Sequence, residues 1–217
     1  MKKYDLVVVG SGAGLMVLEA ALQQGLKCAI VENAKFGGTC LTKGCIPSKM
    51  LVYPADLIRE AEDAGRVGLK FQPPEADWAA VSERMWGQIG HSEGIRRSLK
   101  RVQGLDVYEG TAAFTGKRRM QVLGDGGEAS EEFGARTFVL AAGARSFVPK
   151  IEGLDEAGYV TSERFFGDRY PKTPWKSVVI VGGGAIGAEF AHIFSAFGAK
   201  VTVVEMQDRI LPLEEEE

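Results

Sequence analysis

Close to its start the chain reads Tyr4-Asp5-Leu6-Val7-Val8-Val9-Gly10-Ser11-Gly12-Ala13-Gly14. A helical pattern follows from about Leu15 to Gln24, Gly25 is placed to end it, and a second apolar run ends at Glu32. A strand, a glycine-rich turn, a helix and a second strand form the βαβ unit that binds dinucleotides. This stretch therefore predicts an α/β fold of the Rossmann type.

The glycines of the turn have separate expected roles. Gly10 permits the tight turn, and Gly12 lets the backbone approach a pyrophosphate at the helix N-terminus. Glu32, 22 residues after Gly10, is placed to accept hydrogen bonds from a ribose. One departure from the G-x-G-x-x-G pattern is Leu15, which stands at the third glycine position. We therefore expect looser packing of helix on strand, unless Gly14 compensates.

The next stretch is Gly37-Gly38-Thr39-Cys40-Leu41-Thr42-Lys43-Gly44-Cys45-Ile46-Pro47-Ser48-Lys49. A regular helix would separate the Cα atoms of residues i and i+5 by about 8.6 Å, more than the roughly 7 Å limit for a disulfide. If the two sulfurs pair, Cys40 must lie off the helix or in a distorted first turn. Cys45 would then lie beside a helix N-terminus, with Lys49 on the same face, and both features favour a thiolate. The pattern indicates redox chemistry rather than a structural cross-link.

This cysteine stretch resembles the active-site signature of the flavoprotein disulfide reductases, the family of dihydrolipoamide dehydrogenase, glutathione reductase, mercuric reductase and mycothione reductase. The resemblance implies that FAD and NAD are the cofactors. It implies that hydride passes between nicotinamide and flavin, and that the flavin exchanges electrons with the Cys40–Cys45 pair. Cys45 would face the flavin and Cys40 would exchange with a small dithiol or disulfide. Lys49 would lie near the flavin, paired with Glu189.

The opening pattern is repeated in Val179-Ile180-Val181-Gly182-Gly183-Gly184-Ala185-Ile186-Gly187, here with all three glycines in register. A helix is expected from about Ala185 to Phe197, followed by a strand that ends at Glu205. Two such units imply two nucleotides. The carboxylate of Glu205 predicts NAD rather than NADP, because it would bond ribose hydroxyls and repel a 2′-phosphate.

The predicted fold class is α/β: a Rossmann-like FAD-binding domain with a β-hairpin or meander excursion, followed by the start of a second Rossmann-like NAD-binding domain. Short strands are expected near residues 105–108, 112–114 and 120–123, with the turn Asp125-Gly126-Gly127 before a strand partner at 129–133. Residues 1–150 are assigned to the first segment of the FAD-binding domain, with the cysteine pair. Residues 151–217 are assigned to a linker and the truncated beginning of the NAD-binding domain.

The resemblance extends to further residues of the cofactor sites. Gly110-Thr111-Ala112 matches the family segment beside the adenine, and Ala141-Ala142-Gly143 matches a strand end that reads Ala-Thr-Gly in the family. The missing hydroxyl at Ala142 implies contact through the backbone alone. The catalytic candidates are Cys40, Cys45, Lys49 and Glu189. The cofactor-binding candidates are Gly10, Gly12, Ala13, Gly14, Glu32, Gly38, Thr39, Lys49, Ala112, Ala142, Gly143, Gly182, Gly184, Ile186, Gly187 and Glu205.

Composition and charge narrow the class of protein. The net charge of −3 provides no basic face for nucleic acid, and no apolar run is long enough to span a membrane. The apolar start is interrupted by glycines and lacks a small-residue cleavage site, so we read it as a first strand of a cytoplasmic protein. Cys28 is expected to be a buried core residue, and His91 and His192 to be surface or packing residues. No Cys/His cluster has metal-ligand spacing.

Family chains are much longer than this one, and only twelve residues follow Glu205. The parts without a counterpart are the rest of the nicotinamide domain, a second flavin segment and the dimerisation domain with its His–Glu acid/base pair. We therefore expect an incomplete and inactive isolated chain, a homodimer for the full-length form, and an unpaired edge and uncovered apolar face on the second βαβ unit. The alternative is a truncated, non-catalytic FAD-binding module.

The substrate is the least determined part. The Cys-x4-Cys-Ile-Pro-Ser-Lys form looks most like dihydrolipoamide dehydrogenase, whereas residues 49–55 and 189–198 look more like mycothione reductase. A carboxylate at Glu205 favours an NAD-dependent dehydrogenase. The prediction is lipoamide-type dithiol oxidation, with mycothione, glutathione or mercuric reductase activity as alternatives.

Overall fold

The computed structural model describes residues 1–72, 74–212 and 214–215. They form two compact units, one made of Met1–Thr42 with Ile89–Phe147, the other of Lys43–Gln88 with Val148–Glu217. Within the described residues, no helix combines the length and apolar character needed to cross a bilayer.

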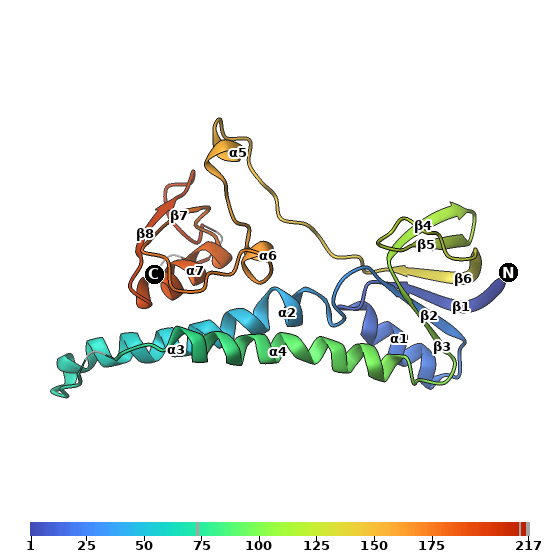
Figure 1. Ribbon diagram of the computed structural model, residues 1–217, viewed down its shortest axis with the longest axis horizontal. Helices are drawn as coiled ribbons and strands as arrows, with labels where there is room; N and C mark the ends of the chain where they lie inside the picture. Colours follow the sequence, from blue (N-terminus) through green and yellow to red (C-terminus); the bar gives the residue numbers. More distant parts are fainter. Residues whose placement is uncertain (73, 213, 216–217) are drawn as a thin grey trace. The chain divides into compact units, whose positions relative to one another are not determined.

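The first unit is built on a six-stranded sheet with the order β3-β2-β1-β6-β5-β4 (Figure 1). Its strands are β1 (Lys2–Val9), β2 (Cys28–Glu32), β3 (Leu105–Glu109), β4 (Thr111–Gly116), β5 (Arg119–Leu123) and β6 (Phe133–Leu140). The four strands β3, β2, β1 and β6 are parallel, and β5 and β4 continue the sheet in antiparallel pairing. The predicted Rossmann-like core with a hairpin excursion is confirmed.

One face of this sheet is covered by α1 (Gly14–Gln23) and by the C-terminal half of α4 (Trp78–Leu99). Leu18 and Ala21 of α1 point into the sheet, because they lie three residues apart on one side of the helix. They pack with Cys28 and Ile30, both 0% exposed. The core position predicted for Cys28 is confirmed.

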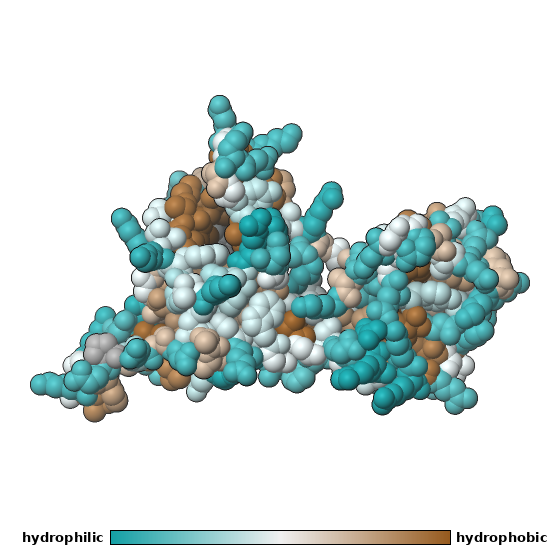
Figure 2. All heavy atoms as spheres, in the orientation of Figure 1, coloured by the Kyte–Doolittle hydropathy of each residue, from teal (hydrophilic) through white to brown (hydrophobic). Residues whose placement is uncertain are grey.

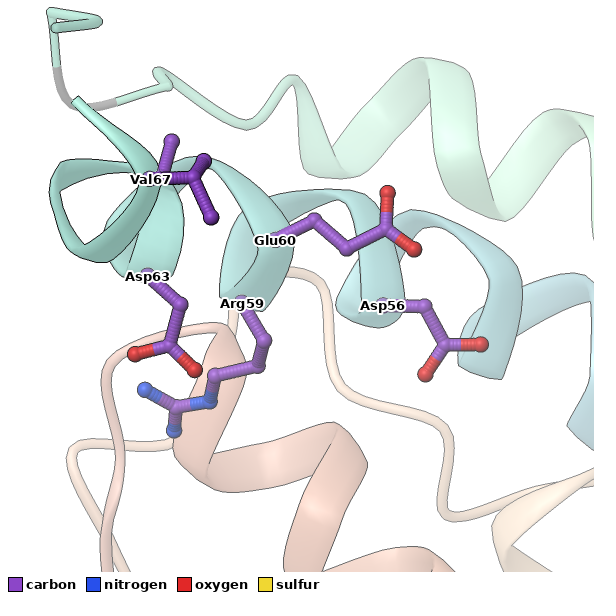
Figure 3. A pocket seen from close by; sticks show the side chains of 6 residues that line it. Asp56, Arg59, Glu60, Asp63 and Val67 are labelled. Atoms are coloured by element: carbon purple, nitrogen blue, oxygen red, sulfur yellow. The ribbon is translucent and has the colours of Figure 1, made fainter. Parts of the chain in front are cut away.

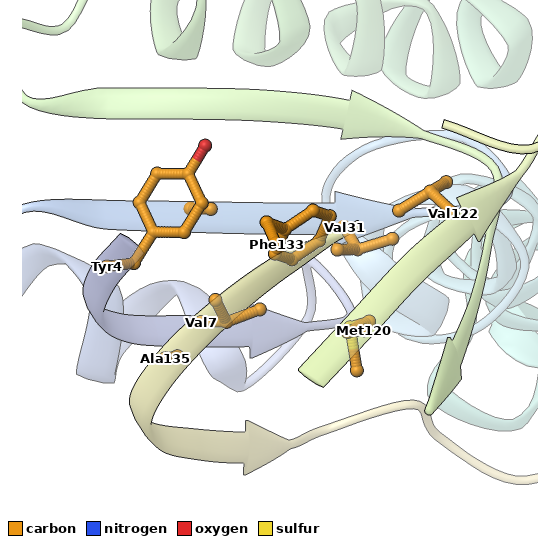
Figure 4. Packing of buried hydrophobic residues seen from close by; sticks show 8 residues of the cluster. Tyr4, Val7, Val31, Met120, Val122, Phe133 and Ala135 are labelled. Atoms are coloured by element: carbon orange, nitrogen blue, oxygen red, sulfur yellow. The ribbon is translucent and has the colours of Figure 1, made fainter. Parts of the chain in front are cut away.

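The other face is covered by the sheet itself, because the β4–β5 hairpin curls over it. The buried cluster consists of Tyr4, Val7, Ala29, Val31, Met120, Val122, Phe133 and Ala135 (Figure 4). At its centre the Phe133 ring stacks on Tyr108, with centroids 4.6 Å apart, and meets the Tyr4 ring edge-on at 5.6 Å. The aromatic rings fill the space between parallel and antiparallel parts of the sheet.

A polar network closes this cluster at the amino end of β1. The Tyr4 hydroxyl donates to Asp106 Oδ2 at 2.5 Å and lies 2.7 Å from the Tyr108 hydroxyl. Burial, and then the bond to Asp106, raise the pKa of Tyr4. The bond from Tyr4, together with nearby Lys2, holds the pKa of Asp106 below its usual range. The carboxylate is thus ionised wherever the protein is folded at neutral pH.

The expected strand at residues 129–133 is wrong in its extent. Only a single bridge joins Ala129 to Leu123, and β6 begins at Phe133. The Ser130 hydroxyl accepts the Val122 N–H at 3.0 Å, while the Ser130 N–H donates to the Val122 carbonyl at 2.8 Å. A side chain takes the place of the backbone acceptor, so the ladder stops there.

The second unit contains α3 (Cys45–Asp63), the short 3-10 helix η1 (Ala64–Val67), the start of α4 and a parallel β7–β8 pair. Its remaining elements are α5 (Leu154–Ala157), α6 (Ser162–Phe165), β7 (Ser177–Val181), α7 (Ala185–Ala196) and β8 (Lys200–Val204). The predicted start of a second Rossmann-like unit is therefore present as β7-α7-β8. The short helices α5 and α6 were not predicted.

An aromatic cluster holds α6 on α7. The Phe165 ring lies 5.1 to 5.7 Å from the rings of five others, which are Phe166, Tyr170, Trp175, Phe190 and Phe194. Phe165 is only 2% exposed. Edge-to-face ring pairs of this kind stabilise beyond the area that they bury. The linker segment around α6 is thereby fixed to the second βαβ unit.

The β7–β8 pair is covered by α7 on one face only. Alternate side chains on the other face are open to solvent, with Val179 67%, Val181 53% and Val204 51% exposed. Figure 2 shows brown, apolar atoms at the surface in the region of β7. This is the uncovered apolar face that the sequence predicts for a βαβ unit with only two strands.

The Phe133 side chain is expected to carry much of the stability of the first unit. Phe133→Ala should cost about 3–5 kcal/mol, because it opens a cavity under Tyr4 and Tyr108. Hydrogen exchange of β1 and β6 amides in the full-length gene product should then accelerate by roughly a hundredfold or more. The matched control is Phe114→Ala, whose ring is 53% exposed and lies edge-on to the ring of Phe138. Equal effects of both variants would contradict the assigned core.

Candidate functional site

The first glycine-rich loop ends β1 with a sharp turn. Gly10 has φ +99°, and a Cβ placed on it would lie 2.1 Å from the Ala141 carbonyl oxygen. A Cβ on Gly14 would lie 2.6 Å from Val8 Cγ1 and 3.1 Å from Ala141 Cβ. Gly14 thus makes the close helix–strand approach that the third glycine usually makes. The sequence predicts looser packing at Leu15 unless Gly14 compensates. Gly14 does compensate, so the looser packing is not found.

Gly37 and Gly38 form a second glycine pair, and the backbone of Gly38 packs against that of Gly12 in the first loop. Gly38 has φ +68°, and a Cβ on it would lie 2.4 Å from the Gly12 Cα. The reverse contact is ordinary, since a Cβ on Gly12 would lie 3.5 Å from the Gly38 Cα. Two backbones without side chains therefore line this place, beside Ala13 at the start of α1. Such a backbone cradle fits a pyrophosphate, for which helix N-termini and bare amides are the usual ligands.

The Glu32 carboxylate is bound to the glycine-rich loop. Its Oε2 accepts the Ser11 backbone N–H at 2.8 Å and the Ser11 hydroxyl at 2.6 Å, and its Oε1 accepts the Ala34 N–H at 2.9 Å. Each carboxylate oxygen has capacity for a further bond. Glu32 lies at the carboxyl end of β2, where a Rossmann fold holds its ribose.

The other flavin-domain candidates lie along the same edge of the sheet. The Gly110 N–H donates to the Glu32 carbonyl at 2.8 Å, which brings Thr111 and Ala112 beside the end of β2. The Ala141 N–H donates to the Val9 carbonyl at 2.8 Å, so Ala142 and Gly143 directly follow the end of β6. The carboxyl ends of β1, β2 and β6 thus share one edge, which is where open α/β sheets bind ligands.

The two cysteines lie in separate helices. Thr39 and Cys40 are in the five-residue α2 (Gly38–Thr42), and Cys45 is the first residue of α3. Between them Gly44 has φ −141° and ψ −119°, far from helical values, so α3 starts anew. Cys40 therefore lies outside the helix that begins at Cys45, as their pairing would require. Both side chains are exposed.

The helix α3 carries an ion pair with the second repeat. Lys49 Nζ bonds Glu189 Oε1 of α7, and the Ser48 hydroxyl lies 3.4 Å from the same oxygen. The Lys49 side chain is 65% exposed and that of Glu189 25%. The pair expected from the resemblance is present, and it places a carboxylate against the first turn of α3.

Three further contacts in this unit were not predicted. Lys43, between the two cysteines, pairs with Glu163 of α6; His192 Nε2 lies 2.7 Å from Asp56 Oδ1; and Arg59 donates to the Ser195 hydroxyl at 2.9 Å. His192 is thus a packing residue between α3 and α7, as expected. The partners are more than a hundred residues apart in sequence, so no local pattern could have revealed them.

The second glycine-rich loop repeats the carboxylate bond of the first. Glu205 Oε2 accepts the Gly183 N–H at 2.6 Å, and its Oε1 accepts the N–H groups of Met206 and Gln207 at 2.7 and 2.9 Å. These bonds, that from Gly183 first, hold the pKa of Glu205 below its usual value. Gly182 has φ +108° and Gly184 precedes α7, whose residue Ile186 is exposed. A Cβ on Gly187 would lie 2.0 Å from the Gly182 carbonyl oxygen, so a glycine is needed there.

The pocket shown in Figure 3 contains none of the predicted site residues. It is lined by Asp56, Arg59, Glu60, Asp63, Ala64 and Val67 of α3 and η1. Its three carboxylates oppose binding of a phosphate. Within the described residues, no group of three His, Cys, Asp or Glu side chains is arranged to hold a metal ion.

The chain matches a known protein family over nearly its whole length. Residues 4–217 match the family model described as pyridine nucleotide-disulphide oxidoreductase. Over 97% of the chain, the sequence is 36% identical to a dihydrolipoyl dehydrogenase of Acholeplasma laidlawii, of which it covers 62%. It is 37% identical over 94% of its length to a mycothione reductase of Mycobacterium tuberculosis, and 32% identical over 97% to a glutathione reductase of Burkholderia cepacia.

Among solved structures, the chain is similar to a Cu(II) complex of the HOCl-induced flavoprotein disulfide reductase RclA from Escherichia coli. The TM-score is 0.81 with 27% identity, over 99% of this chain and 45% of that one. The chain likewise spans 44% and 45% of the mycothione and glutathione reductases. It therefore corresponds to about half the length of most of these relatives.

The space around each glycine distinguishes Gly12, which is expected to matter for cofactor binding alone, from Gly14, which is expected to matter for folding as well. Gly12→Ala should keep the fold, because its methyl meets only an ordinary contact, but should lower the flavin content of the purified protein at least tenfold by filling the pyrophosphate approach. Gly14→Ala should lose stability as well, because its methyl collides with Val8. Visible flavin absorbance and circular dichroism measure the two effects.

The control for these variants is Gly94→Ala in α4, where nothing lies within 4 Å of the new methyl. It should keep the flavin and stabilise the helix by about 0.5–1 kcal/mol. Full flavin content in Gly12→Ala would contradict the cradle.

Proposed function

Because the chain belongs to the pyridine nucleotide-disulphide oxidoreductase family, we propose that it is an FAD- and NAD-dependent disulfide oxidoreductase. Its redox pair is Cys40 with Cys45, and its substrate is a small dithiol of the dihydrolipoamide type. One observation carries the proposal most strongly: Gly38, two residues before Cys40, contacts the dinucleotide loop at Gly12 through bare backbone. The cysteine stretch thus begins at the cofactor cradle.

The residues that would hold FAD lie in the first unit, apart from Lys49. Gly10, Gly12, Ala13, Gly14 and Gly38 would face the pyrophosphate, Glu32 the ribose, and Thr39, Ala112, Ala142 and Gly143 would make the remaining contacts. The family resemblance also assigns Lys49, a residue of the second unit, to the flavin. Bound FAD supplies the two-electron chemistry that connects a pyridine nucleotide with a dithiol. The NAD site would comprise Gly182, Gly184, Ile186, Gly187 and Glu205. We assign residues 1–150 to the FAD-binding domain and 151–217 to a linker and the beginning of the NAD-binding domain.

The chain's own residues support the thiol chemistry. Cys45 is the first residue of the 19-residue helix α3, at the positive end of the helix dipole. Lys49 adds a positive charge one turn later, and its partner Glu189 fixes the position of that charge. Cys40 is exposed on a separate short helix, as a group that exchanges with a substrate must be.

Dithiol oxidation then follows ordinary thiol–disulfide exchange. A substrate thiolate attacks Cys40 Sγ of the Cys40–Cys45 disulfide, that bond breaks, and Cys45 leaves as a thiolate. The second substrate thiolate attacks the substrate sulfur of the mixed disulfide and releases Cys40 as a thiolate. The substrate leaves as a disulfide, and its two electrons remain on the cysteine pair, from which NAD is the final acceptor.

We also propose the partners, the oligomeric state and the location of the enzyme. Small dithiols or disulfides are its partners, the full-length form is a homodimer, and the location is cytoplasmic. The apolar start forms β1, an inner strand of the sheet, as the sequence predicts.

The substrate assignment predicts a specific ranking of activities. The full-length gene product should turn over NAD with dihydrolipoamide faster than NADH with mycothiol disulfide or glutathione disulfide. Cys40→Ser and Cys45→Ser should each abolish turnover, by about 10³-fold or more, because either change removes the disulfide. Flavin content should stay unchanged. Faster turnover of either disulfide would transfer the assignment to that reductase class, and activity in Cys45→Ser would contradict the redox pair.

The nucleotide assignment predicts a preference that does not change with pH. Because the pKa of Glu205 lies below its usual value, its side chain is a carboxylate throughout pH 5.5 to 8.5, and the ratio of kcat/KM for NADH to that for NADPH should be constant there. Glu205→Ala should lower that ratio about tenfold or more, by removing both the ribose bonds and the repulsion of a 2′-phosphate. Asp208→Asn, a nearby loss of the same charge, should leave the ratio within about twofold. Wild-type preference for NADPH would overturn the assignment.

A further inference from the structure

We propose that the Ser11 hydroxyl is a positioning group that joins the ribose-binding carboxylate of Glu32 to the loop leading into α2. The inference rests on the proposed FAD site and adds a residue to it. Neither the glycine pattern nor the cysteine stretch requires a serine at this position.

The hydroxyl makes two directed bonds in a place without solvent. It donates to Glu32 Oε2 at 2.6 Å and accepts the Gly37 N–H at 3.0 Å. Ser11 is 0% exposed, so water does not compete for either bond. A hydroxyl has one proton, which goes to the carboxylate here, and the remaining lone pairs face the Gly37 amide. Ser11 is therefore a single-atom connection between two loops.

The two loops are those that face the cofactor cradle. Gly37 has φ +108° and is followed by Gly38. A Cβ on Gly38 would lie 2.4 Å from the Gly12 Cα, so the two backbones are in close contact. Two residues later comes Cys40 in α2. A change in the position of Glu32 would thus be transmitted through one oxygen to the peptide that precedes the cysteine stretch.

The second repeat provides an internal comparison. Gly183 stands where Ser11 stands, and its N–H also donates to the strand-end carboxylate, at 2.6 Å to Glu205 Oε2. The backbone bond is therefore common to both loops, whereas the hydroxyl connection exists only in the first. The carbonyl of Gly183 instead accepts the Leu211 N–H at 2.8 Å. Removing the hydroxyl should leave the shared bond and separate the two loops of the first unit.

The carboxylate gains a fixed orientation from this arrangement. Three donors, the Ser11 N–H, the Ser11 hydroxyl and the Ala34 N–H, hold both oxygens of Glu32. A preoriented acceptor binds a ribose hydroxyl without first losing side-chain freedom. The hydroxyl therefore contributes to affinity although it need not contact the ligand.

The test uses Ser11→Ala and Ser11→Gly in the full-length gene product, with Ser92→Ala as control. Ser92 is a buried serine of α4 in the same unit, 6% exposed. Both Ser11 variants should raise the Kd for FAD about tenfold in titrations of the flavin-free protein followed by flavin fluorescence. Hydrogen exchange of the Gly37 amide should accelerate about tenfold without FAD, while amides of β1 and β6 keep their rates.

Each outcome decides a separate question. FAD affinity within twofold of wild type in both Ser11 variants, or an unchanged Gly37 exchange rate, would overturn the inference. Weaker binding accompanied by equally faster exchange in β1 and β6 would also overturn it, because it would mark a general loss of stability. Ser11→Gly reproduces the glycine of the second loop and remains informative if Ser11→Ala does not fold. A wild-type protein that binds no FAD would overturn the proposed function itself.

Discussion

Both glycine-rich loops depend on one interaction, the bond from the second residue of the loop to a carboxylate at the end of the next strand. Glu32 accepts the Ser11 N–H at 2.8 Å, and Glu205 accepts the Gly183 N–H at 2.6 Å. A charge-assisted bond of this kind is about twice as strong as a neutral one. It ties the end of the second strand to the turn after the first, and thereby sets the direction in which the helix N-terminus points.

The tight turns that this bond stabilises leave no room for side chains. Gly10, Gly14 and Gly187 each lie where a Cβ would come within 2.6 Å of another atom. In the first unit the same restriction extends to Gly38, so the cysteine stretch starts against the loop. The backbone contact between Gly12 and Gly38 thus joins the glycine-rich loop to the start of the cysteine stretch.

Much of this could be predicted from the sequence, because the signals are local. The glycine spacing and the apolar runs indicated both βαβ units, and the spacing of the two cysteines indicated that Cys40 must lie off the helix, or in a distorted first turn, if they pair. The helix α2 was missed because Gly37 precedes it and Gly38 is its first residue, and glycine lowers helix propensity. It forms because Leu41 is buried and the Thr42 hydroxyl bonds the Gly38 carbonyl at 2.8 Å. The pair between Lys43 and Glu163 spans 120 residues and leaves no local signal.

The identity of the bound flavin tests whether the first glycine-rich loop binds a dinucleotide. The purified full-length gene product is denatured, and the released flavin is identified by chromatography and counted against protein. We expect one FAD per chain, because Glu32 stands where a Rossmann fold binds the adenosine ribose of a dinucleotide. Release of FMN, which has no adenosine, or of no flavin at all would contradict it.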